Sequence, residues 1–221
     1  MSRPVAVLRP EPGNAATTAR VEAAGLTAIR LPLFAVRAID WTAPDPARFD
    51  ALILTSANAP RLAGPALDAL AHLPVFAVGP ATAAAARAHG LTVAATGGGD
   101  GTEIVVALTA RGFRRALLLA GRERRVQAGG VVAEAITVYA SDPLPIAAEV
   151  VTALAGSVAL LHSTRAAKHL AEIAGAARPS LRLAAISEAV ATAAGTGWAA
   201  VAASPAPDDA ALIALARRLA D

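Results

Sequence analysis

Several aliphatic segments of the chain end in small or polar residues that could bind an anion. The segment ALILTSANAP at 51–60 has four core residues followed by Thr55, Ser56 and Asn58, and the segment VALLHSTRAA at 158–167 is built in the same way. In open α/β sheets, ligands bind beyond the carboxyl ends of the strands. Hydroxyl groups and the free N–H groups of helix N-termini bind anions there, although the same hydroxyl groups also serve as helix caps. The residue pairs at the predicted strand ends are Arg9-Pro10, Thr55-Ser56, Gly79-Pro80, Gly121-Arg122, Ser163-Thr164 and Ser187-Glu188.

The sequence lacks the patterns of the common metal and nucleophile sites. The four histidines have no metal-ligand spacing such as HExxH, so we interpret them as surface or boundary residues and expect no metal site. A serine nucleophile is not indicated either, because there is no GxSxG motif and neither Ser56 nor Ser163 has an identifiable base partner.

The glycine-rich stretch TGGGDGTE at 96–103 also matches no cofactor fingerprint. It fits neither the dinucleotide-binding pattern nor the P-loop pattern. We expect a loop in which Asp100 or Thr102 caps the helix that follows, and we expect no cofactor.

Two further features could contact a ligand. Arg122, Arg124 and Arg125 follow a predicted strand end and form the densest basic cluster in the chain. Their planar guanidinium groups suit carboxylate and phosphate, although a solvated loop is the alternative interpretation. Tyr139 is the only tyrosine and lies on an extended connector, where its ring either faces a binding cleft or packs against the connector.

The composition favours a globular protein with a core of small aliphatic residues. Hydrophobic residues make up 55% of the 221 residues but aromatic residues only 3%, so alanine, valine, leucine and isoleucine must form the core. No segment reaches the roughly 18 apolar residues of a membrane span, and there is no signal-peptide core. The absence of cysteine fits a reducing compartment, so we expect a cytoplasmic protein. A net charge of +3 with few aromatic residues does not favour a nucleic-acid partner.

Short aliphatic runs alternate with alanine-rich helical stretches along the whole chain. Strands that are apolar throughout and alternate with helices are typical of a parallel sheet covered on both faces. The predicted strands cover residues 5–8, 28–31, 51–54, 75–78, 91–94, 116–120, 135–139, 158–161, 181–186 and 199–202. The predicted helices cover residues 15–24, 57–71, 81–89, 102–111, 165–176, 188–194 and 208–220.

The two halves of the chain repeat one another, which favours two related α/β units. ALILTSANAP leads through a helix to VFAVGPAT, and VALLHSTRAA leads through a helix to LRLAAISEAVAT. The segments at 31–40 and 136–145 are rich in β-formers and proline, and we interpret them as extended connectors. If the two connectors pair, they join two lobes and leave a cleft between them.

The order of these segments resembles that of the uroporphyrinogen-III synthases. The matching stretches are LRPEP, GLTAIRLPLFAV, ALILTSANAP, VFAVGPATAAAARAHG, AITVYASDP and DDAALIALARRLA. The resemblance covers essentially the whole chain, and its most specific part is the pair TSxN and VGxAT at their observed separation.

The resemblance implies two small parallel-sheet α/β lobes with a cleft between them. One lobe would contain residues 1–33 and 143–221, and the other would contain 41–135. Linker strands at 34–40 and 136–142 would join the lobes. The implied reaction is the cyclisation of hydroxymethylbilane, a linear tetrapyrrole with eight carboxylates, to uroporphyrinogen III, with loss of water and inversion of the last pyrrole ring. The family uses no metal or organic cofactor, and its members are expected to be monomers.

The resemblance also implies roles for individual residues. Tyr139 matches a family tyrosine and is the expected catalytic residue, either as the proton donor to the leaving hydroxyl group or as a positioning group. The expected substrate-binding residues are Arg9, Thr55, Ser56, Asn58, Gly79, Ala81, Thr82, Gly121, Arg122, Ser163, Thr164 and Ser187.

The second half of the chain departs from the family pattern. Thr164-Arg165 stands where proline commonly follows the serine, SEAVA at 187–191 replaces GPTTA, and the helix after Gly121 is shorter than in the family. The alternative interpretation is a bilobed small-molecule binding module without enzymatic activity, since one fold can support both functions.

Overall fold

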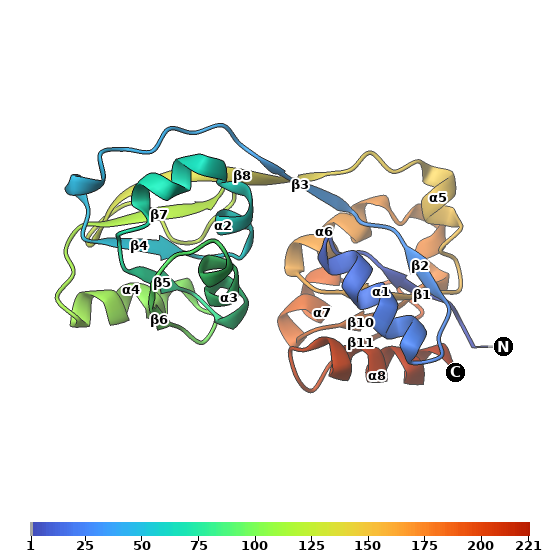
Figure 1. Ribbon diagram of the computed structural model, residues 1–221. Coiled ribbons are helices and arrows are strands. Elements are labelled where there is room, and N and C mark those ends of the chain that lie inside the picture. The colour runs from blue at the N-terminus through green and yellow to red at the C-terminus, as the bar shows by residue number, and fades with distance from the viewer. Residues whose placement is uncertain (1) are drawn as a thin grey trace. The chain divides into compact units, whose positions relative to one another are not determined.

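A computed structural model describes residues 2–221, which form two compact α/β units (Figure 1). Unit 1 contains residues up to Ala35 and Pro143–Asp221, and unit 2 contains Val36–Asp142. Each unit is built on a mostly parallel sheet flanked by helices, so the predicted fold class is confirmed.

The sheet of unit 1 has five parallel strands in the order β11-β10-β9-β1-β2. The strands are β1 (Val5–Val7), β2 (Ala28–Arg30), β9 (Val158–Leu161), β10 (Arg182–Ala185) and β11 (Ala200–Ala203). The helices are α1 (Gly13–Ala23), α5 (Ala148–Thr152), α6 (Thr164–Ile173), the 3₁₀-helix η3 (Gly175–Ser180), α7 (Glu188–Ala194) and α8 (Asp209–Ala220).

Helices cover both faces of this sheet. Val5 and Val7 of β1 belong to the apolar cluster that contains α1 and α8, whereas Ala6 and Leu8 belong to the cluster of α6 and α7. All four side chains are fully buried, because successive residues of a strand point to opposite faces and each face is covered. The strands therefore carry apolar residues at every position.

Unit 2 contains a six-stranded sheet in the order β3-β8-β7-β4-β5-β6. The strands are β3 (Phe34–Ala38), β4 (Ala51–Leu54), β5 (Val75–Ala77), β6 (Val93–Thr96), β7 (Ala116–Gly121) and β8 (Val132–Pro143). The helices are η1 (Pro46–Arg48), α2 (Asn58–Leu62), η2 (Gly64–Leu70), α3 (Pro80–Ala88) and α4 (Gly101–Ala110). The strands β4 to β8 pair in parallel, and the N–H of Ile39, just after β3, donates to the carbonyl of Val138 in β8.

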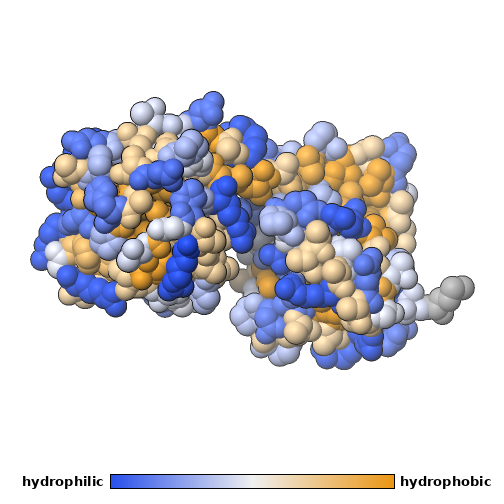
Figure 2. Space-filling view, viewed as in Figure 1, coloured by the Kyte–Doolittle hydropathy of each residue, from blue (hydrophilic) through white to orange (hydrophobic). Residues whose placement is uncertain are grey.

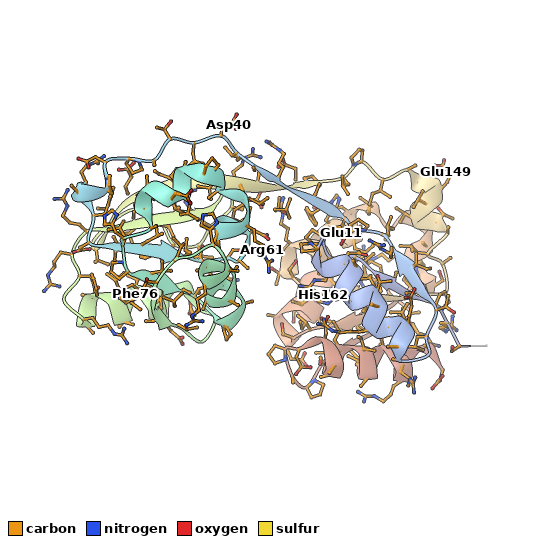
Figure 3. All side chains as sticks on the ribbon, in the orientation of Figure 1. Glu11, Asp40, Arg61, Phe76, Glu149 and His162 are labelled. Carbon is orange, nitrogen blue, oxygen red and sulfur yellow. The ribbon has the colours of Figure 1, made fainter. Side chains whose placement is uncertain are left out.

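The sheet of unit 2 is also covered on both faces. Leu52 and Leu54 of β4 pack with α2 and α3, and Ile53 packs with α4. Phe76 lies inside this second cluster (Figure 3). Its ring meets that of Phe113 edge to face, with the ring centres 5.0 Å apart.

Two of the predicted helices end earlier than expected. The single helix predicted over 57–71 is wrong, since α2 stops at Leu62 and a separate 3₁₀-helix follows. Gly64 adopts φ 65°, outside the helical range, and Pro65 has no N–H group to continue the ladder. The helix predicted over 165–176 likewise ends at Ile173, just before Gly175, which has φ 47°.

The surface mixes hydrophobic and hydrophilic residues on the visible face of each unit (Figure 2). Within residues 2–221 the exposed large hydrophobic residues are Val106, Val150 and Val201, which lie on three different elements. In the same part of the chain, no helix has the length and apolar character needed to cross a membrane.

A single carboxylate connects three elements of unit 1. The Oδ2 atom of Asp209, the first residue of α8, accepts from Thr17 Oγ1 at 2.7 Å and from Arg20 Nη1 at 2.6 Å. The Nε2 atom of His162, which follows β9, lies 3.1 Å from Oδ1. The hydrogen bond from His162, supported by that from Thr17, holds the pKa of Asp209 well below its usual range. The charged form of Asp209 is therefore favoured by folding.

This network predicts a loss of stability in acid. A lowered folded pKa stabilises the fold above the unfolded pKa of about 3.9, and the contribution is lost as the pH falls below that value. In urea unfolding between about pH 5 and pH 2, we expect Asp209→Asn to flatten the decline of the unfolding free energy with falling pH. The matched control is Asp208→Asn, which should keep the wild-type slope because Asp208 lies outside the Asp209 network and asparagine can retain the cap of α8. Equal slopes in all three proteins would contradict the prediction.

Candidate functional site

Three predicted site residues, Thr55, Ser56 and Asn58, follow strand β4 at the carboxyl edge of the sheet of unit 2. The Oγ atom of Ser56 accepts a hydrogen bond from the backbone N–H of Asn58 at 3.2 Å. Ser56 therefore binds the free amide at the start of α2, as a capping residue does. Thr55, Ser56 and Asn58 are all half-buried, so their polar atoms lie where the covered sheet meets solvent.

Strand β5 leads into a helix N-terminus that has no side-chain cap. Gly79 precedes α3 with an extended backbone and no side chain, and Pro80 has no N–H group. The amides of Ala81 and Thr82 lie in the first turn, where a helix has no internal acceptor for its N–H groups. Ala81 is exposed and Thr82 is only 4% exposed. This helix start can therefore receive an anion through its backbone.

The glycine-rich loop packs directly against the same strand end. The N–H groups of Gly97 and Gly99 donate to the carbonyls of Ala77 and Val78 at 2.9 and 2.8 Å. A Cβ atom on Gly97 would lie 3.1 Å from the Val78 carbonyl oxygen, so a side chain there would crowd β5. Asp100 caps α4 by accepting from the N–H of Thr102. Of the two caps predicted from the sequence, Asp100 and Thr102, the structure has Asp100. A role of this loop in the site was not predicted from the sequence, although consecutive glycines are a signal of close backbone approach.

Tyr139 is placed by its pairing with Gly121. The two residues are partners in the β7–β8 ladder, and the N–H of Arg122 donates to the Tyr139 carbonyl at 2.9 Å. A Cβ atom on Gly121 would lie 2.7 Å from Cζ of Tyr139 and 2.9 Å from its hydroxyl oxygen, so the ring covers the bare backbone of Gly121. Within residues 2–221 the hydroxyl group has no hydrogen-bond partner.

The arginine cluster after β7 is largely committed to acceptors of its own unit. Arg122 Nη1 lies 2.8 Å from Asp142 Oδ1, and Arg37 Nε lies 2.7 Å from Asp142 Oδ2. The hydrogen bond from Arg37, together with the positive charge of Arg122, lowers the pKa of Asp142. Arg124 donates to Thr137 Oγ1 at 2.7 Å and to a backbone carbonyl. A ligand carboxylate would compete with Asp142 for Arg122.

In unit 1, Arg9 follows strand β1 and joins the Asp209 network. Its Nη1 atom lies 3.3 Å from Thr17 Oγ1 and 3.4 Å from Asp209 Oδ1. His162 completes the network, and its ring lies within the body of unit 1 (Figure 3). This pairing was not predicted from the sequence, because 47 residues separate His162 from Asp209.

Ser163 and Ser187 begin two helices at the same edge of the sheet of unit 1. Ser163 Oγ accepts from the N–H of Ala166 at 3.1 Å and caps α6, and Thr164 is the first residue of that helix. Ser187 has the same extended backbone before α7, but its side chain makes no capping bond. The exposed carboxylate of Glu188 follows it, so this helix start is less suited to an anion.

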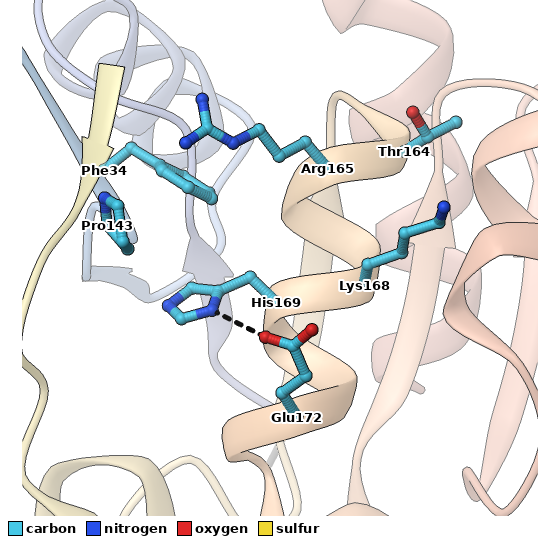
Figure 4. Close-up of a pocket in the computed structure, with 7 residues that line it drawn as sticks. All are labelled: Phe34, Pro143, Thr164, Arg165, Lys168, His169 and Glu172. Atoms are coloured by element: carbon cyan, nitrogen blue, oxygen red, sulfur yellow. Dashed lines mark hydrogen bonds and ion pairs between the residues drawn. The ribbon is translucent and has the colours of Figure 1, made fainter. Parts of the chain in front are cut away.

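Beside Thr164, unit 1 has a cavity of about 420 Å³ (Figure 4). Arg165 and His169 project from α6 toward Phe34, and Arg165 lies over the Phe34 ring at 4.4 Å from its centre. The cavity is lined by Phe34, Pro143, Thr164, Arg165, Lys168, His169 and Glu172. Two basic side chains, Arg165 and Lys168, line it beside the single carboxylate of Glu172, a balance that suits an anion.

Within each unit, the predicted residues share the carboxyl edge of the sheet or the helix starts that follow it. Unit 1 contains Arg9, Ser163, Thr164 and Ser187. Unit 2 contains Thr55, Ser56, Asn58, Gly79, Ala81, Thr82, Gly121, Arg122 and Tyr139. Within residues 2–221, no three histidine, aspartate or glutamate side chains gather in a way that could hold a metal ion.

Known proteins resemble the chain in sequence pattern and in fold. The family model for uroporphyrinogen-III synthase HemD matches residues 15–214. A comparison with curated protein sequences finds no match. The crystal structure of uroporphyrinogen-III synthetase from Helicobacter pylori has a TM-score of 0.70 at 20% identity, with 98% of this chain and 99% of that chain covered. A mutant uroporphyrinogen III synthase from the extremely thermophilic bacterium Thermus thermophilus has a TM-score of 0.59 at 17% identity, with 98% of each chain covered.

At such identities, likeness to the solved structures shows the fold alone. The family match adds the sequence pattern, and it spans most of the chain. The chain belongs to the uroporphyrinogen-III synthase family.

Proposed function

We propose that the protein is a cyclising hydro-lyase that converts hydroxymethylbilane into uroporphyrinogen III, with loss of water and inversion of the last pyrrole ring. Membership of the family supports this reaction. The structural observation that carries the proposal is the chemistry of the two sheet edges. They present hydroxyl groups, bare glycine backbone and helix starts rather than a nucleophile with its base.

Such edges suit a substrate with eight carboxylates. An anion at a helix N-terminus gains typically 0.3–1 kcal/mol from the dipole, and it also receives hydrogen bonds from the free amides. In unit 2 the first turn of α3 offers the amides of Ala81 and Thr82, and in unit 1 the first turn of α6 follows Ser163. Each edge would hold its own carboxylates of the substrate.

The reaction requires little acid–base catalysis by the protein. The hydroxyl group of the substrate is protonated and leaves as water, so one C–O bond breaks and a cation stabilised by the neighbouring pyrrole remains. The substituted α-carbon of the last pyrrole ring attacks that cation and forms a C–C bond, which gives a spiro intermediate. The bond from this α-carbon to its original bridging carbon then breaks, the bridging carbon bonds to the free α-carbon of the same ring, and that carbon loses a proton, so the ring is inverted. Because the unassisted closure gives the non-inverted type I isomer, the protein must hold the chain in the geometry of a spiro-type transition state.

We further propose that the protein is a cytoplasmic monomer that uses no metal or organic cofactor. The absence of cysteine fits a reducing compartment. The exposed large hydrophobic residues of residues 2–221 are three valines on three different elements, which is consistent with a monomer.

The product isomer tests the proposal. We expect the protein, mixed with freshly generated hydroxymethylbilane, to yield mainly uroporphyrinogen III, measured by chromatography after oxidation of the product. The heat-denatured protein serves as the control and should yield the type I isomer. If the native protein yields only the type I isomer, the synthase activity is rejected. The alternative function, a small-molecule binding module without enzymatic activity, then remains.

Tyr139 is the proposed proton donor to the leaving hydroxyl group. Its hydroxyl has no partner within residues 2–221, and the ring is held by Gly121 rather than by a polar contact. A phenol can donate a proton, and a positioned general acid contributes typically 10²–10⁴-fold to a rate.

Two variants test separately the role of the Tyr139 hydroxyl group and the role of the ring's position. Tyr139→Phe keeps the packing on Gly121, and we expect it to lower kcat on the order of 10²-fold. Gly121→Ala keeps the hydroxyl group but places a Cβ atom where the ring lies, so we also expect lower turnover and more type I product. Unchanged turnover and isomer ratio in Tyr139→Phe would exclude the role of the hydroxyl group.

Ser163 can be tested without loss of its cap. Asp caps a helix about as well as Ser, so Ser163→Asp should keep the thermal unfolding midpoint of the wild type. The added negative charge should repel a substrate carboxylate and raise KM about 10-fold, corresponding to roughly 1.4 kcal/mol. Ser163→Asn, which caps without the charge, is the control and should change KM less. Equal KM values for the two variants would show that no carboxylate binds there.

A further inference from the structure

Arg9 is held in place by the backbone around it. Asn14 is fully buried, and its Nδ2 atom donates to the carbonyls of Val7 and Arg9 at 2.7 and 3.0 Å, which fixes the turn after β1. A Cβ atom on Gly13 would lie 2.5 Å from Nε of Arg9 and 2.8 Å from its Cζ. The guanidinium group therefore lies against the bare backbone of Gly13, in space that any other residue would fill.

Asp209 holds Arg9 only loosely. The contacts of Arg9 Nη1 with Asp209 and Thr17 are 3.4 and 3.3 Å long, whereas Asp209 accepts from Thr17 at 2.7 Å. Arg9 Nε and Nη2 make no hydrogen bond within residues 2–221, and the side chain is 35% exposed. Arg9 thus keeps donors free for a second anion, while Asp209 limits where its guanidinium group can lie.

His162 is a buried partner of Asp209. Its side chain is 8% exposed, and its Nδ1 atom is buried without a partner in the described part of the chain. Because a carboxylate is only an acceptor, Nε2 must carry the proton that is shared with Asp209. The buried Nδ1 atom cannot reach a ligand, so His162 can influence binding only through Asp209.

We propose that Asp209, supported by His162 and Thr17, is the positioning residue that prepares Arg9 to bind one carboxylate of the substrate. The inference rests on the proposed function, because hydroxymethylbilane supplies the carboxylate. Arg9 binds the carboxylate, and Asp209 acts only through Arg9. Because the side chain of Arg9 is already restricted before the substrate binds, binding costs less conformational entropy.

A double-mutant cycle in the full-length protein tests this assignment. We expect Asp209→Asn and Arg9→Gln each to raise KM for hydroxymethylbilane about 5- to 10-fold with kcat within about twofold, the pattern of lost uniform binding. In the double variant KM should equal that of Arg9→Gln alone, since coupled residues are not additive. The matched control is Asp208→Asn, which alters the neighbouring carboxylate that caps α8 and does not contact Arg9. Its KM should equal that of the wild type.

Gly13→Ala provides a second test that removes no charge and no hydrogen bond. Gly13 lies at the first position of α1 and does not have a positive φ, so alanine is compatible with the backbone. The added methyl group must displace Arg9, and we expect KM to rise at an unchanged thermal unfolding midpoint. If Asp209→Asn does not fold, this variant still tests whether substrate binding depends on where the guanidinium group of Arg9 lies.

The possible outcomes separate this inference from the proposed function. If the wild type forms type III product but KM is unchanged or lowered in Asp209→Asn, Asp209 does not position Arg9 for the substrate, and the synthase assignment stands. KM effects that multiply in the double variant would equally reject the coupling. If the wild type forms only type I product, the proposed function fails and this inference fails with it.

Discussion

Both units depend on the constraint that a parallel sheet covered on both faces cannot contain unpaired polar side chains. The four residues of β4 and the four residues of β9 are all fully buried. A polar group inside such a strand would lose its water without gaining a partner, at a cost of roughly 1–3 kcal/mol. The chemistry of the protein is therefore displaced to the strand ends, where Thr55, Ser56 and Ser163 lie. The apolar strands and the polar edges are two consequences of one requirement.

The two units meet this requirement in different ways. The edge of unit 2 is made largely of backbone, because Gly97 lets the main chain of β5 approach closely and Gly121 does the same for the ring of Tyr139. The edge of unit 1 contains a charge network around Asp209, which lowers the pKa of that carboxyl group and contacts the guanidinium group of Arg9. Two of the three segments that depart from the family pattern, Thr164-Arg165 and 187–191, lie in unit 1, and the third, after Gly121, lies in unit 2. The two edges of this family member are thus related in topology but not in chemistry.

The fold class and the strand positions could be predicted because they depend on hydrophobic pattern, which is read along the chain. The helix boundaries were less accurate, since Gly64 and Gly175 end helical segments that alanine content alone would continue. Part of the site was also predictable, because a cap is made within a few residues of its own helix. Ser163 bonds to Ala166 and Asp100 bonds to Thr102 whatever the rest of the chain does.

By itself, the sequence determined which segments are strands, which hydroxyl groups begin helices and which family the pattern resembles. Only the tertiary structure decided that Asp209 meets Arg9 and His162, that Asp142 occupies Arg122, and that Tyr139 lies on Gly121. These contacts depend on strand order and register, which bring together residues that are far apart along the chain. A pattern of residue types carries local information about burial and capping, whereas the choice of partners across a sheet is made only when the whole chain folds.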